Sequence, residues 1–148
     1  MLEFECKNLQ KVPLFKNIDA KALQLIAFAA SRVSFQPGEA VFERGGASDA
    51  IYIVVDGEVD SFTYSEDGTE RQLARFGPGR SFGETSVLND VNRFITVRAH
   101  TSAMLLQISK PDFLELMREI PQFSLAVARD LARRLEIMID KHASQPPA

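Results

Sequence analysis

Hydrophobic positions along this chain follow a helical period, then a strand period, then a helical period again. In the first block the apolar residues fall three or four positions apart, at Leu23, Ile26, Ala27 and Ala30. This spacing predicts an amphipathic helix from Ala20, with Asp19 as its N-cap. Residues 1–12 lack a clear pattern and form an N-terminal arm that fits a short helix or a frayed segment.

From Arg32 onward the apolar period shortens, and glycine breaks the chain into strand-length pieces. The candidate strands are 32–36, 40–43, 51–56, 58–64, 70–76, 93–100 and 103–108, with a brief eighth at 80–82. Turn signals lie between them, and the clearest hairpin tip is Ser65–Thr69, where Asp67-Gly68 supplies the positive φ angles of a tight turn. Many short strands at regular spacing predict a sandwich or barrel.

Helical signals return after Ser109, which forms a capping arrangement with Asp112, and Pro121 separates this helix from a longer one over 122–141. The apolar stripe of the longer helix comprises Ala128, Leu131, Leu135 and Met138, widened by Phe123, Val127 and Ile137. Such a wide stripe serves either as ordinary core or as a seam for a second copy of the chain, and both interpretations stay open. The order of elements is typical of an α+β protein that is mainly β, with one domain over 13–141 and a tail over 142–148.

Composition excludes several classes of protein. The chain has 148 residues, a net charge of -3 and a pI near 5.4, so its surface is not built for direct nucleic-acid binding. A single cysteine, Cys6, permits no internal disulfide, and neither a signal peptide nor a membrane-spanning stretch is present, which favours the cytoplasm. Only His100 and His142 are available as imidazole ligands, which argues against a metal enzyme.

The candidate chemistry lies between Phe82 and Arg98. Gly83 lets a ligand approach the backbone, and Glu84, Thr85 and Ser86 suit the first turn of a short helix, where free N–H groups attract an anion. Arg93, nine positions after Glu84, is expected to enter the next strand and to close on a phosphate. Glu84 would instead accept hydrogen bonds from a hydroxyl of the same ligand. A phosphate clamp beside a hydroxyl acceptor indicates the sugar and phosphate of a nucleotide.

These residues resemble the cassette of the cyclic nucleotide-binding domains found in protein kinase regulatory subunits, cyclic-nucleotide-gated channels and the catabolite activator family. The upstream match comprises Pro37-Gly38-Glu39, Val41, Gly45, Asp49, Tyr52, Ile53, Gly57 and Val59, and the downstream match comprises Phe82-Gly83-Glu84, Arg93 and Thr96-Val97. The resemblance covers about residues 14–139.

The resemblance implies a double-stranded β-helix, or jelly roll, with an N-terminal helix and C-terminal helices. It further implies that Arg93 binds the cyclic phosphate and that Glu84 accepts a hydrogen bond from the ribose 2′-hydroxyl. The backbone of Gly83, Thr85 and Ser86 would complete the phosphate-binding site, which we call the nucleotide seat. The chain would then be a sensor of cAMP or cGMP with no other cofactor and no enzymatic activity. Its C-terminal helices would signal to an effector domain or protein outside these residues.

Two residues depart from the family pattern. Phe94 and Ile95 stand where the family has small residues, and their bulk is expected either to crowd the ligand or to stack on its base. Because position 94 lacks a hydroxyl, the resemblance favours cAMP over cGMP.

The alternative is a cassette that has lost its ligand, with Arg93 in a structural ion pair such as one with Glu84, and with the domain acting as an interaction or dimerisation module. The charges of the last helix alternate in sign, through Arg129, Asp130, Arg133, Arg134, Glu136, Asp140 and Lys141. This alternation is typical of a solvated face.

Overall fold

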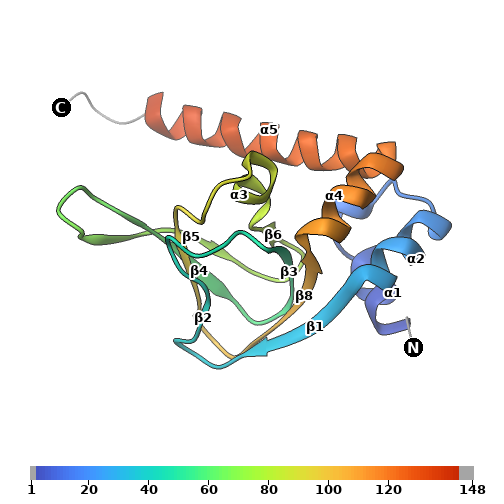
Figure 1. The fold of residues 1–148 in the computed structure, drawn as a ribbon, viewed down its shortest axis with the longest axis horizontal. Helices are drawn as coiled ribbons and strands as arrows, with labels where there is room; N and C mark the ends of the chain where they lie inside the picture. Colours follow the sequence, from blue (N-terminus) through green and yellow to red (C-terminus); the bar gives the residue numbers. More distant parts are fainter. Residues whose placement is uncertain (1–2, 144–148) are drawn as a thin grey trace.

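Two four-stranded antiparallel sheets face each other in a computed structural model that describes residues 3–143 (Figure 1). The first sheet has the strand order β1 (Ala30–Phe35), β8 (Ala103–Ser109), β3 (Ala50–Asp56) and β6 (Ser81–Phe82). The second has the order β2 (Ala40–Phe42), β7 (Thr96–Ala99), β4 (Val59–Tyr64) and β5 (Glu70–Phe76). The predicted jelly roll, with α-helices at both ends of the sequence, is confirmed.

Strand β3 lies at the centre of the core because both of its faces are covered. Residues 50–54 are all buried, so this strand lacks the alternation of a half-exposed sheet. Tyr52 and Val54 join the apolar cluster inside the barrel, which includes Val59 of β4. Ile51 and Ile53 join a second cluster, formed with the helices.

Most of the helices pack beside the first sheet: α1 (Glu3–Gln10), the 3-10 helix η1 (Pro13–Phe15), α2 (Ala20–Ala29) and α4 (Lys110–Glu119) (Figure 1). Both predicted caps are present. Asp19 accepts a hydrogen bond from the Ala22 backbone N–H at 2.8 Å, and Ser109 accepts one from that of Asp112 at 3.3 Å. The arm that fitted either a helix or a frayed segment is helical over α1, where Leu9 is fully buried.

The last helix, α5 (Pro121–Ala143), crosses above the short helix α3 (Glu84–Asn89) (Figure 1). Its first half is anchored in the core by Phe123 and Val127. The second half carries exposed apolar side chains, namely Leu135, Ile137, Met138 and Ile139. Because α5 ends at Ala143, it includes the first two residues of the tail predicted over 142–148. Residues 144–148 lie outside the described part of the chain. None of the described helices is long and apolar enough to cross a bilayer.

The hairpin tip between β4 and β5 has one positive φ angle. Gly68 has φ of 86°, and its N–H donates to the Ser65 carbonyl at 2.9 Å, whereas Asp67 keeps a negative φ. The prediction that both residues of the Asp-Gly pair take positive φ is therefore wrong for Asp67. Its carboxylate instead accepts from the Thr69 N–H at 3.0 Å, so this residue closes the turn through its side chain.

Candidate functional site

Arg93 lies in the loop before β7, and the prediction that it enters the strand is wrong. The reason is its backbone pairing: its N–H donates to Gly46 at 2.8 Å, and its carbonyl accepts from Gly45 at 2.7 Å. These bonds tie the loop to the Gly45-Gly46 turn, and β7 starts three residues later, at Thr96. Ser48 fixes the same loop by donating its hydroxyl to the Val91 carbonyl at 2.6 Å.

The guanidinium of Arg93 is turned into the protein, and the residue is only 3% exposed. Its Nη1 donates to the Gly83 carbonyl at 2.8 Å, and its Nη2 donates to the Ala50 carbonyl. The Phe42 ring covers one face, with its centroid 3.9 Å from the guanidinium carbon. A guanidinium has five N–H donors, so three remain, and among them the buried Nε–H has no partner.

The charge of Arg93 is also uncompensated. Within residues 3–143 no carboxylate pairs with it, and both of its hydrogen-bond acceptors are neutral carbonyls. Burial lowers the pKa of the Arg93 guanidinium, while Coulombic interactions with Tyr52, Asp49 and Glu84 act in the opposite direction and offset this only in part. The alternative of an Arg93–Glu84 ion pair is thus not what the structure contains. A buried cation without a counter-ion is costly, and an anion would relieve that cost.

Glu84 begins α3 and is 3% exposed, so it is not the solvated first-turn carboxylate that its position alone would indicate. Its Oε2 lies 3.4 Å from Nη1 of Arg134 and accepts from the Ser81 hydroxyl at 3.4 Å. Its Oε1 is buried and has no partner. Burial raises the pKa of the Glu84 carboxyl, and the charge of Arg134 only partly offsets this effect. Oε1 is therefore free to accept a hydrogen bond from a ligand hydroxyl.

Arg134 of α5 is the residue of this site that the sequence analysis missed. The alternating charges of the last helix predicted a solvated face, yet Arg134 reaches back to the cassette and donates to the Ser81 carbonyl at 2.6 Å. Asp130, one helical turn earlier, accepts from its Nη2 at 2.8 Å. The i, i+4 spacing of these two residues was visible in the sequence, but the contacts of Arg134 with Ser81 of β6 and Glu84 of α3 were not.

Three other predicted site residues lie at the start of α3 or directly before it. Gly83 has φ of 95°, and a Cβ there would lie 3.1 Å from Nη1 of Arg93, so only glycine permits this approach. Phe82 stacks on Tyr52 with centroids 5.4 Å apart and closes the barrel wall beside the cassette. Ser86 is buried on α3.

Thr85 and Phe94 lie on the surface, and Phe94 is 55% exposed. At this exposure Phe94 does not fill the barrel interior. Ile95 is partly buried against the barrel cluster. The aromatic ring in contact with the arginine is instead that of Phe42, which also touches Tyr52 with centroids 6.0 Å apart.

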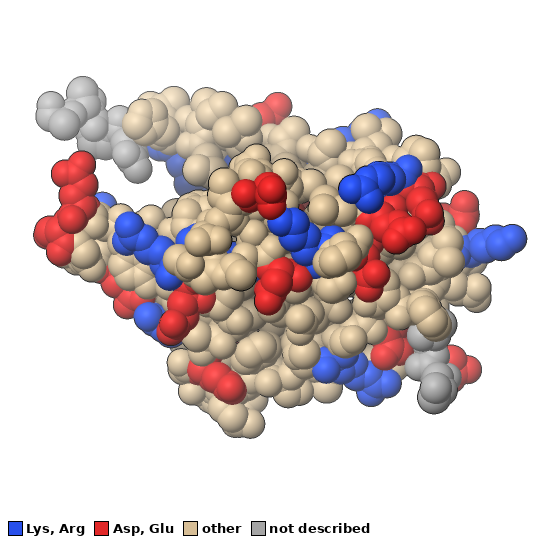
Figure 2. Space-filling model, in the orientation of Figure 1, with Lys and Arg blue, Asp and Glu red and all other residues tan. Residues whose placement is uncertain are grey.

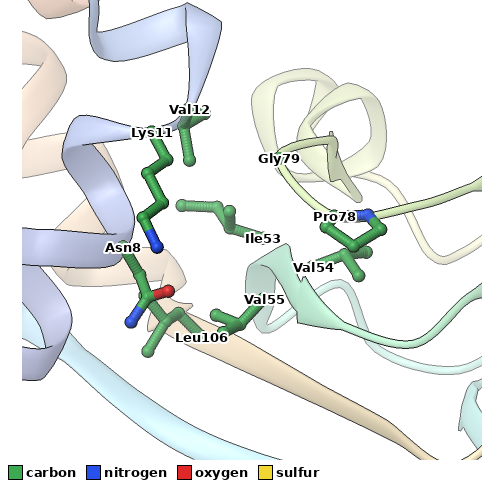
Figure 3. A pocket seen from close by; sticks show the side chains of 9 residues that line it. All are labelled: Asn8, Lys11, Val12, Ile53, Val54, Val55, Pro78, Gly79 and Leu106. Carbon is green, nitrogen blue, oxygen red and sulfur yellow. The ribbon is translucent and has the colours of Figure 1, made fainter.

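A separate cavity of about 110 Å³ lies between α1 and β3 (Figure 3). Its walls are mainly apolar, from residues such as Ile53, Val55 and Leu106, with Asn8 and Lys11 at its helical side. None of the predicted site residues lines it. On the face shown in Figure 2, basic and acidic side chains are interspersed rather than gathered into a basic surface.

A glycine-led helix start, a buried arginine and a buried glutamate on a jelly roll define a nucleotide-sensing type of domain. The family profile of the cyclic nucleotide-binding domain matches residues 32–120, and the chain belongs to this family. It is 34% identical over 123 residues to the cyclic AMP receptor protein of Thermus thermophilus, which covers 83% of this chain. It is 33% identical over 109 residues to the potassium channel KOR1 of Oryza sativa, which covers 74% of this chain.

The crystal structure of the Thermus thermophilus catabolite activator protein has a TM-score of 0.79 and 32% identity, over 88% of this chain and 63% of that one. The chain spans 57% of the length of the cyclic AMP receptor protein and 13% of the channel. The similarity therefore concerns the sensor domain of these larger proteins.

Proposed function

We propose that this chain is a regulatory sensor domain that binds a 3′,5′-cyclic nucleotide, cAMP in preference to cGMP, and leaves it chemically unchanged. The observation that carries the proposal is the buried guanidinium of Arg93, which has a free Nε–H and no carboxylate partner among residues 3–143. A cyclic phosphate beside Gly83 would supply the missing negative charge. The hydrogen bonds would be charge-assisted and geometrically matched to a guanidinium.

The ribose would lie at Glu84. Its unpartnered Oε1 is the one acceptor in the cassette that a 2′-hydroxyl needs, and it is buried, so a hydrogen bond there would be little weakened by water. The name of the Thermus relative supports cAMP as the ligand. The absence of a hydroxyl on Phe94 supports the same preference, through the family pattern.

The signal would leave the site through α5. A ligand hydroxyl on Glu84 would share that carboxylate with Arg134, and a phosphate on Arg93 would draw the cassette inward. Both changes would alter how α5 packs, and a ligand can shift such an equilibrium only by binding one packing more tightly. The regulated activity would then lie in an effector domain or partner protein, with the sensor placed in the cytoplasm.

Isothermal titration calorimetry with cAMP and cGMP tests the proposal. Arg93→Ala should weaken binding at least tenfold, because a hydrogen bond to a charged group is worth about 1.5–3 kcal/mol. Arg98→Ala is the matched control, since Arg98 on β7 pairs with Glu70 at 2.7 Å and is not part of the cassette. Equal affinity of Arg93→Ala and the parent would refute the phosphate assignment.

The second candidate is a ligand-free interaction module, and one observation favours it. Arg93 already donates to two carbonyls and stacks on Phe42, so its site is partly satisfied without nucleotide. Thermal melting separates the two functions. A ligand at a hundred times its dissociation constant stabilises the fold by about 2.7 kcal/mol, whereas the module would melt unchanged at millimolar cAMP or cGMP.

A further inference from the structure

A hollow of about 300 Å³ lies between α5 and the turn that leads into β6, outside the cassette. Three guanidinium groups line it, from Arg80, Arg133 and Arg134, together with a single carboxylate, that of Asp130. Leu14 and Ile137 contribute apolar wall. The chain as a whole carries a net charge of -3, so this local excess of positive charge does not follow from composition.

The donors of these arginines are far from exhausted. Arg80 is exposed, stacks on Phe76 at 5.5 Å, and pairs with no carboxylate in the described part of the chain. Arg133 bonds to Asp130 and keeps a side chain that is 63% exposed. The buried Nε–H of Arg134 has no acceptor.

Asp130 does not cancel this surplus. Its Oδ1 is engaged by Arg133 and its Oδ2 by Arg134 at 2.8 Å, and Arg134 also pairs with Glu84 at 3.4 Å, so two carboxylates stand against three guanidinium groups. Its two oxygens therefore hold the arginines in place. An approaching anion would meet the N–H groups that point away from these contacts.

We propose that this hollow binds a ligand with two or more adjacent phosphate groups, such as a nucleoside triphosphate. Planar guanidinium groups match phosphate oxygens with paired, charge-assisted hydrogen bonds, and several arginines in one hollow suit several linked phosphates. The apolar wall can pack against the nonpolar part of such a ligand, as in most small-molecule sites. The volume lies at the lower end of the range usual for those sites. The hollow adjoins the cyclic nucleotide seat, because Arg134 also pairs with Glu84 at 3.4 Å, whereas Arg80 and Arg133 belong to the hollow.

Calorimetric titration of the 148-residue protein with tripolyphosphate and with ATP tests the site, at low salt and without Mg²⁺ so that the phosphates keep their full charge. Both ligands should bind, ATP more tightly if its nucleoside contacts Leu14 and Ile137. The double variant Arg80→Gln/Arg133→Gln should weaken both at least tenfold. The matched control Arg71→Gln/Arg118→Gln removes the same charge from exposed positions outside the hollow and should bind as the parent does.

A further variant separates this site from the cassette. Arg93→Gln should keep polyphosphate binding, and the Arg80/Arg133 double variant should keep whatever affinity for cAMP the parent has. The proposal is overturned if neither polyphosphate binds, if the control pair loses as much affinity as the test pair, or if Arg93→Gln abolishes ATP binding. A failure of cAMP to bind the parent would refute the proposed function alone.

Discussion

The carboxylate of Glu84 and the guanidinium of Arg134 lie 3.4 Å apart and join the short helix α3 to the last helix α5. Glu84 is almost completely buried, so this contact is shielded from solvent on its acidic side. This contact therefore joins the cassette directly to α5.

Loss of the basic partner should leave a buried carboxylate without compensation. Arg134→Ala is expected to lower the free energy of unfolding by about 1–3 kcal/mol, measured by urea denaturation. Arg129→Ala, an exposed arginine of the same helix, should change it by less than about 0.5 kcal/mol. In the background of Glu84→Gln the cost of Arg134→Ala should shrink, because no buried charge remains. Equal costs in both backgrounds would show that Arg134 stabilises the fold through contacts other than the one with Glu84, such as those with Ser81 and Asp130.

The stability of the parent and that of Glu84→Gln should depend differently on pH. Burial raises the pKa of Glu84 above its ordinary value of 4.5, so the folded state holds this proton more tightly than the unfolded state. Its contribution to stability is present below the unfolded pKa and is lost as pH rises through the folded pKa. Glutamine has no such dependence. The stability of the parent relative to Glu84→Gln should therefore fall as the pH rises above about 4.5, measured by denaturation at a series of pH values. The opposite trend would mean that Arg134 outweighs burial.

Gly83→Ala should impair both the fold and the site. A φ of 95° is unfavourable for any residue with a Cβ, at a cost of about 1–2 kcal/mol, and the new methyl group would lie 3.1 Å from Nη1 of Arg93. We expect a lower melting temperature and weaker cAMP binding. Gly77→Ala is the matched control, because Gly77 has no positive φ and a Cβ added there would meet no atom within 4 Å, so this variant should melt close to the parent. If Gly83→Ala bound cAMP as tightly as the parent, this glycine would not be required for ligand binding.

The exposed apolar side chains of α5 should govern self-association. Leu135 and Met138 are 57% and 62% exposed and lie three residues apart on the helix. If the apolar stripe of residues 122–141 binds a second copy of the chain, the protein is a homodimer. Leu135→Glu/Met138→Glu should then convert it to a monomer in analytical ultracentrifugation. Leu25→Glu, at an equally exposed position on α2, should leave the assembly unchanged. A parent that sediments as a monomer would rule out this interface.

Local sequence signals predicted the elements well. Asp19 and Ser109 cap the helices that follow them, and the β4 and β5 hairpin forms around Gly68, because each signal depends on residues a few positions apart. The predicted start of β7 was wrong because it depends on residues that are far apart in the sequence. The backbone of Arg93 pairs with Gly45 and Gly46, which are distant in sequence.

The site was predicted in part. The residue types and spacing of the cassette pointed to Glu84 and Arg93, and the structure buries both. Sequence could not show that Arg93 stacks on Phe42 or that Arg134 reaches Glu84, since each contact joins elements brought together only by the fold. The exposure of Phe94 is likewise set by the fold and could not be read from the sequence.

The arginine of the cassette is anchored by the main-chain oxygens of Gly83 and Ala50. Every amino acid supplies a carbonyl, so this anchor depends on the path of the polypeptide and not on the chemistry of neighbouring side chains. Surrounding residues can therefore vary in size and polarity while the cation stays in place. In the proposed sensor, the preference for one base or another could therefore be retuned without rebuilding the part that would hold the phosphate.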